Sequence, residues 1–91
     1  MLTVTEAVKF ASSHLATLFP AAQKMLLEEA EVSDDDRFWL ITLSFFDPNY
    51  DTSPTPSIVN IWGGPRLFRI VKIDSATGEA RSVKIRERQY A

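Results

Sequence analysis

The chain has 91 residues, of which 45% are hydrophobic and 24% charged, and its net charge is −2. This length suits one domain, and the composition is that of a folded globular protein rather than a disordered chain. The sequence contains no cysteine, which excludes disulfides, zinc–thiolate sites and a thiol nucleophile. We therefore expect a single domain over residues 1–91, without a cofactor or a metal.

No stretch approaches the roughly 20 apolar residues that a membrane helix needs. The first residues, Met1 to Glu6, lack the basic start and apolar run of a signal peptide. We expect a cytoplasmic protein that does not contact a membrane, and a processed secreted form remains an alternative.

Charge is distributed unevenly along the chain. Residues 1–50 carry eight acids and three bases, whereas residues 51–91 carry four acids and seven bases. Such asymmetry can indicate two electrostatic faces and a charged partner. It can equally arise from charges that alternate on solvated surfaces.

The first predicted element is an amphipathic helix over residues 4–18. Thr3 and Glu6 have the spacing of a capping box, in which each side chain accepts a hydrogen bond from the other residue's backbone. Pro20 disfavours helical geometry at the preceding residue and so ends the helix. Apolar residues recur at three- and four-residue steps along one stripe, namely Val4, Ala7, Val8, Ala11, Leu15 and Leu18.

Two strands follow, over residues 24–32 and 37–46. In the first, Leu26, Ala30 and Val32 share a parity that Glu28 interrupts. As an alternative to a strand, Glu28, Glu29 and Glu31 would also suit the end of a helix. The run 33–36, Ser-Asp-Asp-Asp, is typical of a turn, because short polar side chains bond their own backbone. Its ligand spacing does not match that of a calcium loop. In the second strand an apolar set of period two should face the helix; it consists of Trp39, Ile41, Leu43 and Phe45.

A long link over residues 47–65 precedes a hairpin whose strands are predicted at 67–74 and 80–88. Gly78 suits a position of positive φ in the connecting turn. By parity, the inner face of the hairpin consists of Val71, Ile73, Val83 and Ile85. The predicted fold is α+β, with one N-terminal helix on a four-stranded antiparallel sheet in the order α-β-β-β-β.

The segment 68–83, with Asp74 ending a hydrophobic strand and Thr77-Gly78-Glu79 in the turn, resembles the closing hairpin of PepSY-type domains. Related small bacterial proteins share this pattern. The resemblance implies a protein-binding or peptidase-regulating role. It implies no catalytic residue, because the shared motif is structural.

The predicted function is a non-enzymatic protein-binding module, inhibitory or immunity-like in kind, whose partner is another protein or a second copy of the chain. Long irregular links in small domains are often functional, so the link should supply the contact. Alternatively, Ile58, Ile61 and Trp62 fold back over the outer sheet face at Phe38, Leu40 and Phe46. The predicted partner-binding residues are Tyr50, Ile58, Ile61, Trp62 and Arg66.

Nucleic-acid binding through a basic hairpin face is the alternative function, although a pI near 5.3 weakens it. Its residues would be Arg69, Lys72, Lys84, Arg86 and Arg88, of which Arg69 has the inner parity. An enzyme is less well supported. His14 is the single histidine, and the acidic residues 28–36 suit a solvated turn better than an acid–base pair.

Overall fold

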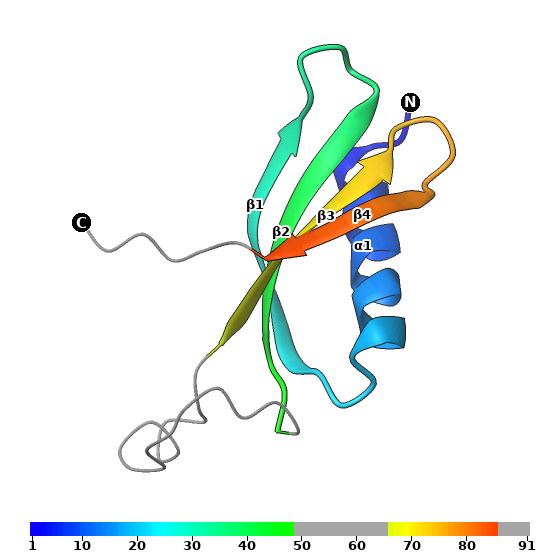
Figure 1. Cartoon of the computed structure of the whole chain (residues 1–91). Helices are drawn as coiled ribbons and strands as arrows, with labels where there is room; N and C mark the ends of the chain where they lie inside the picture. The colour runs from blue at the N-terminus through cyan, green and yellow to red at the C-terminus, as the bar shows by residue number, and fades with distance from the viewer. Residues whose placement is uncertain (49–65, 86–91) are drawn as a thin grey trace, which may run out of the picture.

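The structure is an antiparallel sheet of four strands with one helix across one of its faces (Figure 1). It is a computed structural model, and it describes residues 1–48 and 66–85. The strands lie in the sheet in chain order, β1-β2-β3-β4. This confirms the predicted α+β fold. The elements are α1 (Val4–Leu18), β1 (Gln23–Val32), β2 (Phe38–Phe46), β3 (Leu67–Asp74) and β4 (Ala80–Ile85).

The helix α1 begins at the predicted capping box. The Thr3 hydroxyl accepts from the Glu6 amide at 3.2 Å, and a Glu6 carboxylate oxygen accepts from the Thr3 amide at 2.9 Å. The hydrogen bond that the Thr3 amide donates to the Glu6 carboxylate is the main reason why the pKa of Glu6 lies below its ordinary value. The helix ends at Leu18, and the amide of Phe19 still donates to the Leu15 carbonyl at 2.7 Å.

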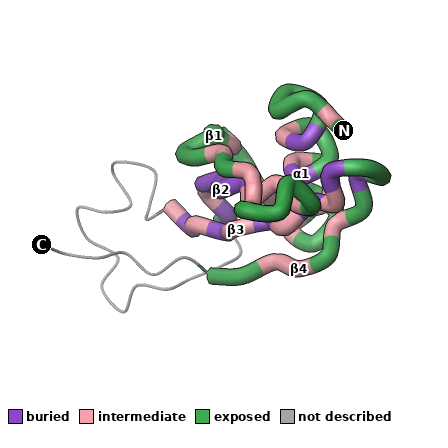
Figure 2. Tube along the Cα trace, turned by 90° about the horizontal axis from the view of Figure 1, so that it is seen from above, coloured by how far each residue is buried: buried purple, intermediate pink, exposed green. Residues whose placement is uncertain are grey.

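The hydrophobic core lies between α1 and the sheet, where buried stretches of the helix face those of β2 and β3 (Figure 2). Burial alternates along β3, as expected for a strand with one face on the core. The predicted orientation of β2 is confirmed, because its odd-numbered residues enter this core. The core consists of Ala7, Ala11, Leu15, Ile41, Leu43, Phe45, Leu67, Val71 and Ile73.

The shared parity of the β1 residues holds for Ala30 and Val32, which pair with Ile41 and Trp39, but not for Leu26. Leu26 pairs with Ser44, whereas Ala30 pairs with Ile41. The side chain of Leu26 therefore lies on the face away from the helix, and that of Ala30 lies on the helix side. The register shifts twice, and Glu28 sits at the second shift. Each β-bulge adds a residue and reverses the parity that follows, which a rule of strict alternation does not capture.

The turn between β3 and β4 packs against the helix through a glycine. Gly78 has a φ of +80°, as predicted, and a side-chain carbon at this position would lie 2.6 Å from the Phe10 ring. Glycine therefore serves both the backbone conformation and the close approach. The Asp74 carboxylate accepts from the amides of Ala76 and Thr77 at 2.8 and 3.1 Å, which holds the pKa of Asp74 below its ordinary value.

The inner face of the last hairpin is shorter than predicted. Val83 packs against the core, but Ile85 is 66% exposed. The predicted continuation of this strand to residue 88 lies outside the described residues, as does most of the link 47–65. Within residues 1–48 and 66–85, no helix has the length and hydropathy needed to cross a membrane.

Candidate functional site

The sheet has a second face, opposite α1, which we call the helix-free face (Figure 1). Side chains alternate along a strand, so the even-numbered residues of β2 and β3 point away from the core, as do Ser82 and Lys84 of β4, which pair with Lys72 and Ile70. Two of them, Thr42 and Ser44, are only 2% and 0% exposed. The accessible part of this face therefore lies towards the turn between β1 and β2.

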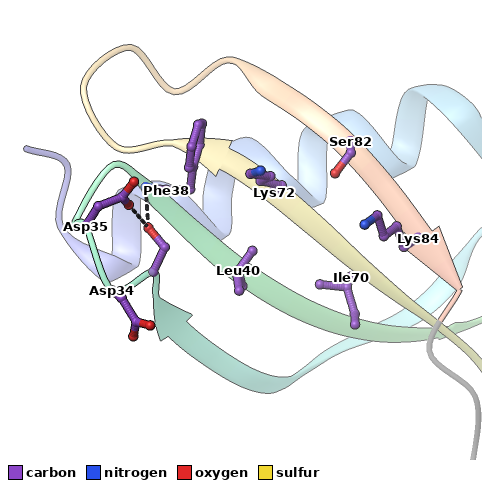
Figure 3. Close-up of a pocket in the computed structure, with 9 residues that line it drawn as sticks. Asp34, Asp35, Phe38, Leu40, Ile70, Lys72, Ser82 and Lys84 are labelled. Atoms are coloured by element: carbon purple, nitrogen blue, oxygen red, sulfur yellow. Dashed lines mark hydrogen bonds between the residues drawn. The ribbon is translucent and has the colours of Figure 1, made fainter.

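A hollow of about 420 Å³ occupies that accessible part (Figure 3). Its apolar residues are Phe38 and Leu40 from β2 and Ile70 from β3, all of them half-buried. Three strands and one turn thus contribute to one surface. The polar lining consists of Ser33, Asp34, Asp35, Lys72, Ser82 and Lys84.

Two cations lie against the Phe38 ring in this hollow. The Lys72 ammonium is 4.2 Å from the ring centroid, and the Arg37 guanidinium carbon is 5.6 Å from it. Cation–π contacts of this kind are worth about 0.5–1 kcal/mol at exposed sites. They hold the aromatic ring and the Lys72 charge together at the surface.

The acidic end of the hollow is a well-ordered turn, which confirms the turn prediction. The Ser33 hydroxyl donates to an Asp35 carboxylate oxygen at 2.7 Å, and the Arg37 amide donates to the same oxygen at 3.2 Å. These bonds, the Ser33 bond foremost, hold the pKa of Asp35 below its ordinary value. Among the described residues, no group of three His, Cys, Asp or Glu side chains is placed to hold a metal ion.

Arg66, a predicted partner-binding residue, joins three strands. Its guanidinium donates to the Ser44 hydroxyl at 3.0 Å, to the Ser44 carbonyl at 2.9 Å and to the Lys24 carbonyl. The Ser44 hydroxyl in turn donates to a Glu28 carboxylate oxygen at 2.6 Å. Arg66 therefore acts within the fold, as a cross-link between β1, β2 and the start of β3.

The predicted basic face does not form as one cluster in the part of the chain that is described. Lys72 and Lys84 lie on the helix-free face and line the hollow (Figure 3). Arg69 lies on the helix side, is 7% exposed and places its guanidinium carbon 5.4 Å from the Phe19 ring centroid. The position of Arg69 agrees with its odd number in β3, which places it on the core side of the sheet. It is therefore separated from Lys72 and Lys84 by the sheet.

Several predicted site residues lie outside the described residues. In the partner-binding set these are Tyr50, Ile58, Ile61 and Trp62, and in the basic set they are Arg86 and Arg88. His14 is half-buried on α1. The hypothesis that the link supplies the contact stays a prediction.

Sequence reasoning did not identify the hollow, although it noted apolar residues at positions 38 and 40. The missing information was strand register, which brings Ile70, Lys72 and Lys84 beside Phe38 and Leu40. Register could have been read from the hairpin, because the turn at Gly78 sets the pairing of β3 with β4. The pairing of β2 with β3 spans the link and has no such local signal.

Comparisons with models of protein families, with curated proteins and with solved structures found no significant match. The resemblance to PepSY-type domains therefore stays a prediction. The chemistry of the site itself, an apolar hollow between acids and lysines, is the basis for a functional proposal.

Proposed function

We propose that this chain is a protein-binding module and that it binds through the accessible part of the helix-free face. The observation that carries the proposal is the hollow, where Phe38, Leu40 and Ile70 are only half-buried between an acidic rim and a lysine rim. An apolar centre with a polar rim is the usual anatomy of a protein interface. The partner should be a protein surface with an apolar centre and the reverse order of charges.

Nucleic-acid binding receives less support from this arrangement. Asp34 and Asp35 line the same hollow as Lys72 and Lys84, and they would repel phosphates. Arg69 is buried on the helix side. Retention on RNA at low salt that disappears in the Lys72→Glu variant would favour the nucleic-acid alternative instead.

Site-specific photo-cross-linking in cells tests the proposal. A photoreactive phenylalanine analogue at position 40 should give a protein adduct of defined mass, whereas the same analogue at Ser13, exposed on α1, should not. The protein in the adduct is identified and purified, and its affinity for the domain is measured. We expect Leu40→Glu to weaken binding at least about tenfold and Ser13→Glu to leave it unchanged.

Two results would overturn the proposal. One is equal cross-linking from both positions, which would indicate random collisions. The other is a purified partner that binds wild type and Leu40→Glu with the same affinity while both proteins remain folded by circular dichroism.

A further inference from the structure

The charges on the helix-free face are ordered across the sheet. The register aligns residues of neighbouring strands into rows. One row, from β1 to β4, consists of Glu31, Leu40, Lys72 and Ser82. The next row consists of Glu29, Thr42, Ile70 and Lys84. In these two rows the acids lie at the β1 edge and the lysines lie on β3 and β4, with Leu40 and Ile70 on the two central strands; the next row towards the turns pairs Phe38 with Asp74.

The two ends of the Glu29 row are complementary in charge to each other. Rotation by half a turn about an axis parallel to the strands places β1 of one copy over β4 of another. Glu29 then faces Lys84 of the second copy, and the same contact occurs twice by symmetry. Packed sheets lie about 10 Å apart, a gap that Glu and Lys side chains can span together.

The other two-fold arrangement is disfavoured by the same charges. An axis that crosses the strands within the interface plane would place β1 over β1, so Glu29 and Glu31 would meet the same acids of the second copy. Like charges in direct opposition are destabilising. The charge order therefore selects one axis.

We propose that the partner of the helix-free face is a second copy of this chain, packed about the two-fold axis parallel to the strands. This inference rests on the proposed function, because it names the partner of the same surface. Leu40 and Ile70 lie at the centre of the interface, where Leu40 faces the side chain of Lys72 of the second copy, and the two Glu29–Lys84 contacts form its rim.

The area of the face sets the strength of the association. Strands about 4.8 Å apart, with about six residues each at 3.3 Å per residue, make a face of roughly 20 by 20 Å. Roughly 400 Å² per copy is an upper limit, because Thr42 and Ser44 on this face are already buried, and it is about half the size of a standard interface. The dimer should therefore belong to the weak, transient class of interfaces and be sensitive to salt.

Sedimentation velocity from about 20 μM to about 1 mM, at low salt, tests the proposal with two charge-reversal variants. Glu29→Lys leaves bases at both edges and Lys84→Glu leaves acids at both edges, so each variant alone should dimerise at least about tenfold more weakly. An equimolar mixture of the two variants should dimerise again, because both rim contacts are restored between unlike chains. Lys9→Glu, the same charge change on exposed α1, should dimerise like wild type.

The absence of cysteine allows a direct test of the axis. Glu31→Cys and Ser82→Cys chains are mixed and treated with a short bismaleimide. Random pairing would give about twice as much mixed adduct as either homodimer adduct. We expect the proportion of mixed adduct to be higher than that. An excess of the Glu31→Cys homodimer would overturn the proposed axis.

A wild-type protein that stays monomeric at about 1 mM overturns the inference, as does a variant mixture that fails to dimerise. The proposed function survives that result if an unrelated protein still binds wild type and loses affinity for Leu40→Glu. The proposed function also fails if the Leu40→Glu variant binds that protein with the same affinity as wild type.

Discussion

The two faces of one strand, β2, have different surroundings. Ile41, Leu43 and Phe45 are at most 1% exposed on the helix side, whereas Phe38 and Leu40 are only half-buried on the other side. All five are large and apolar, so hydrophobicity alone does not distinguish them. The difference comes from α1, which covers the helix side, whereas no helix of the described residues covers Phe38 and Leu40.

The largest expected difference between the faces concerns stability. Phe45→Ala should lower the free energy of unfolding by about 3–5 kcal/mol, because it leaves a cavity in the core. Leu40→Ala, on the opposite face, should lower it by about 1 kcal/mol or less. Urea unfolding of both variants measures the contrast, and equal losses would show that the helix-free face is part of a second core.

The second-largest loss of stability is expected when the hydrogen bonds between Arg66 and Ser44 are removed. Arg66→Met keeps a long apolar side chain but removes the bonds to Ser44 and Lys24. Because Ser44 is buried, we expect a loss of about 1.5–3 kcal/mol. A combined Arg66→Met, Ser44→Ala variant should lose less than the sum of the single variants. Additive losses would mean that the two residues act independently.

A smaller loss is expected at the turn that packs on α1. Gly78→Ala should cost about 1–2 kcal/mol, because the φ of +80° is strained for alanine and its side chain meets the Phe10 ring. Adding Phe10→Ala to this variant should restore the stability lost to the steric contact with the ring, but not the stability lost to backbone strain. Full recovery in the double variant, measured by urea unfolding, would show that the backbone conformation costs alanine nothing.

The smallest expected effect is a fall in stability at acid pH. Hydrogen bonds hold the pKa values of Glu6, Asp35 and Asp74 below their ordinary values of 4.5, 3.8 and 3.8. The unfolded chain takes up protons at these ordinary values, and the folded chain does so only at lower pH. The free energy of unfolding should therefore fall as the pH drops below about 4.5 and through the folded pKa values.

Urea unfolding at several pH values from about 7 to about 2 measures this fall. Asp74→Asn keeps an oxygen that can accept from the turn amides but removes one titrating group. Its stability should consequently depend less on pH than that of wild type. A stability that is flat or rises towards acid pH would contradict the assignment of these hydrogen bonds.

The sequence predicted the elements and the core better than it predicted the site. The helix at 4–18 and the helix-facing side of β2 followed from local signals, a capping box, a proline and alternation of period two. The bulges in β1 and the cross-link at Arg66 depend on contacts between strands that are distant in the chain. Such contacts leave no periodic signal in one sequence.

The helix-free face is tested most directly by intermolecular nuclear Overhauser effects in a mixture of isotope-labelled and unlabelled chains, at about 1 mM. If the face contacts a second copy, the methyl groups of Leu40 and Ile70 should show such effects, and those of the buried Leu15 should not. Intermolecular effects confined to α1 would contradict the account, and so would their absence at this concentration and low salt.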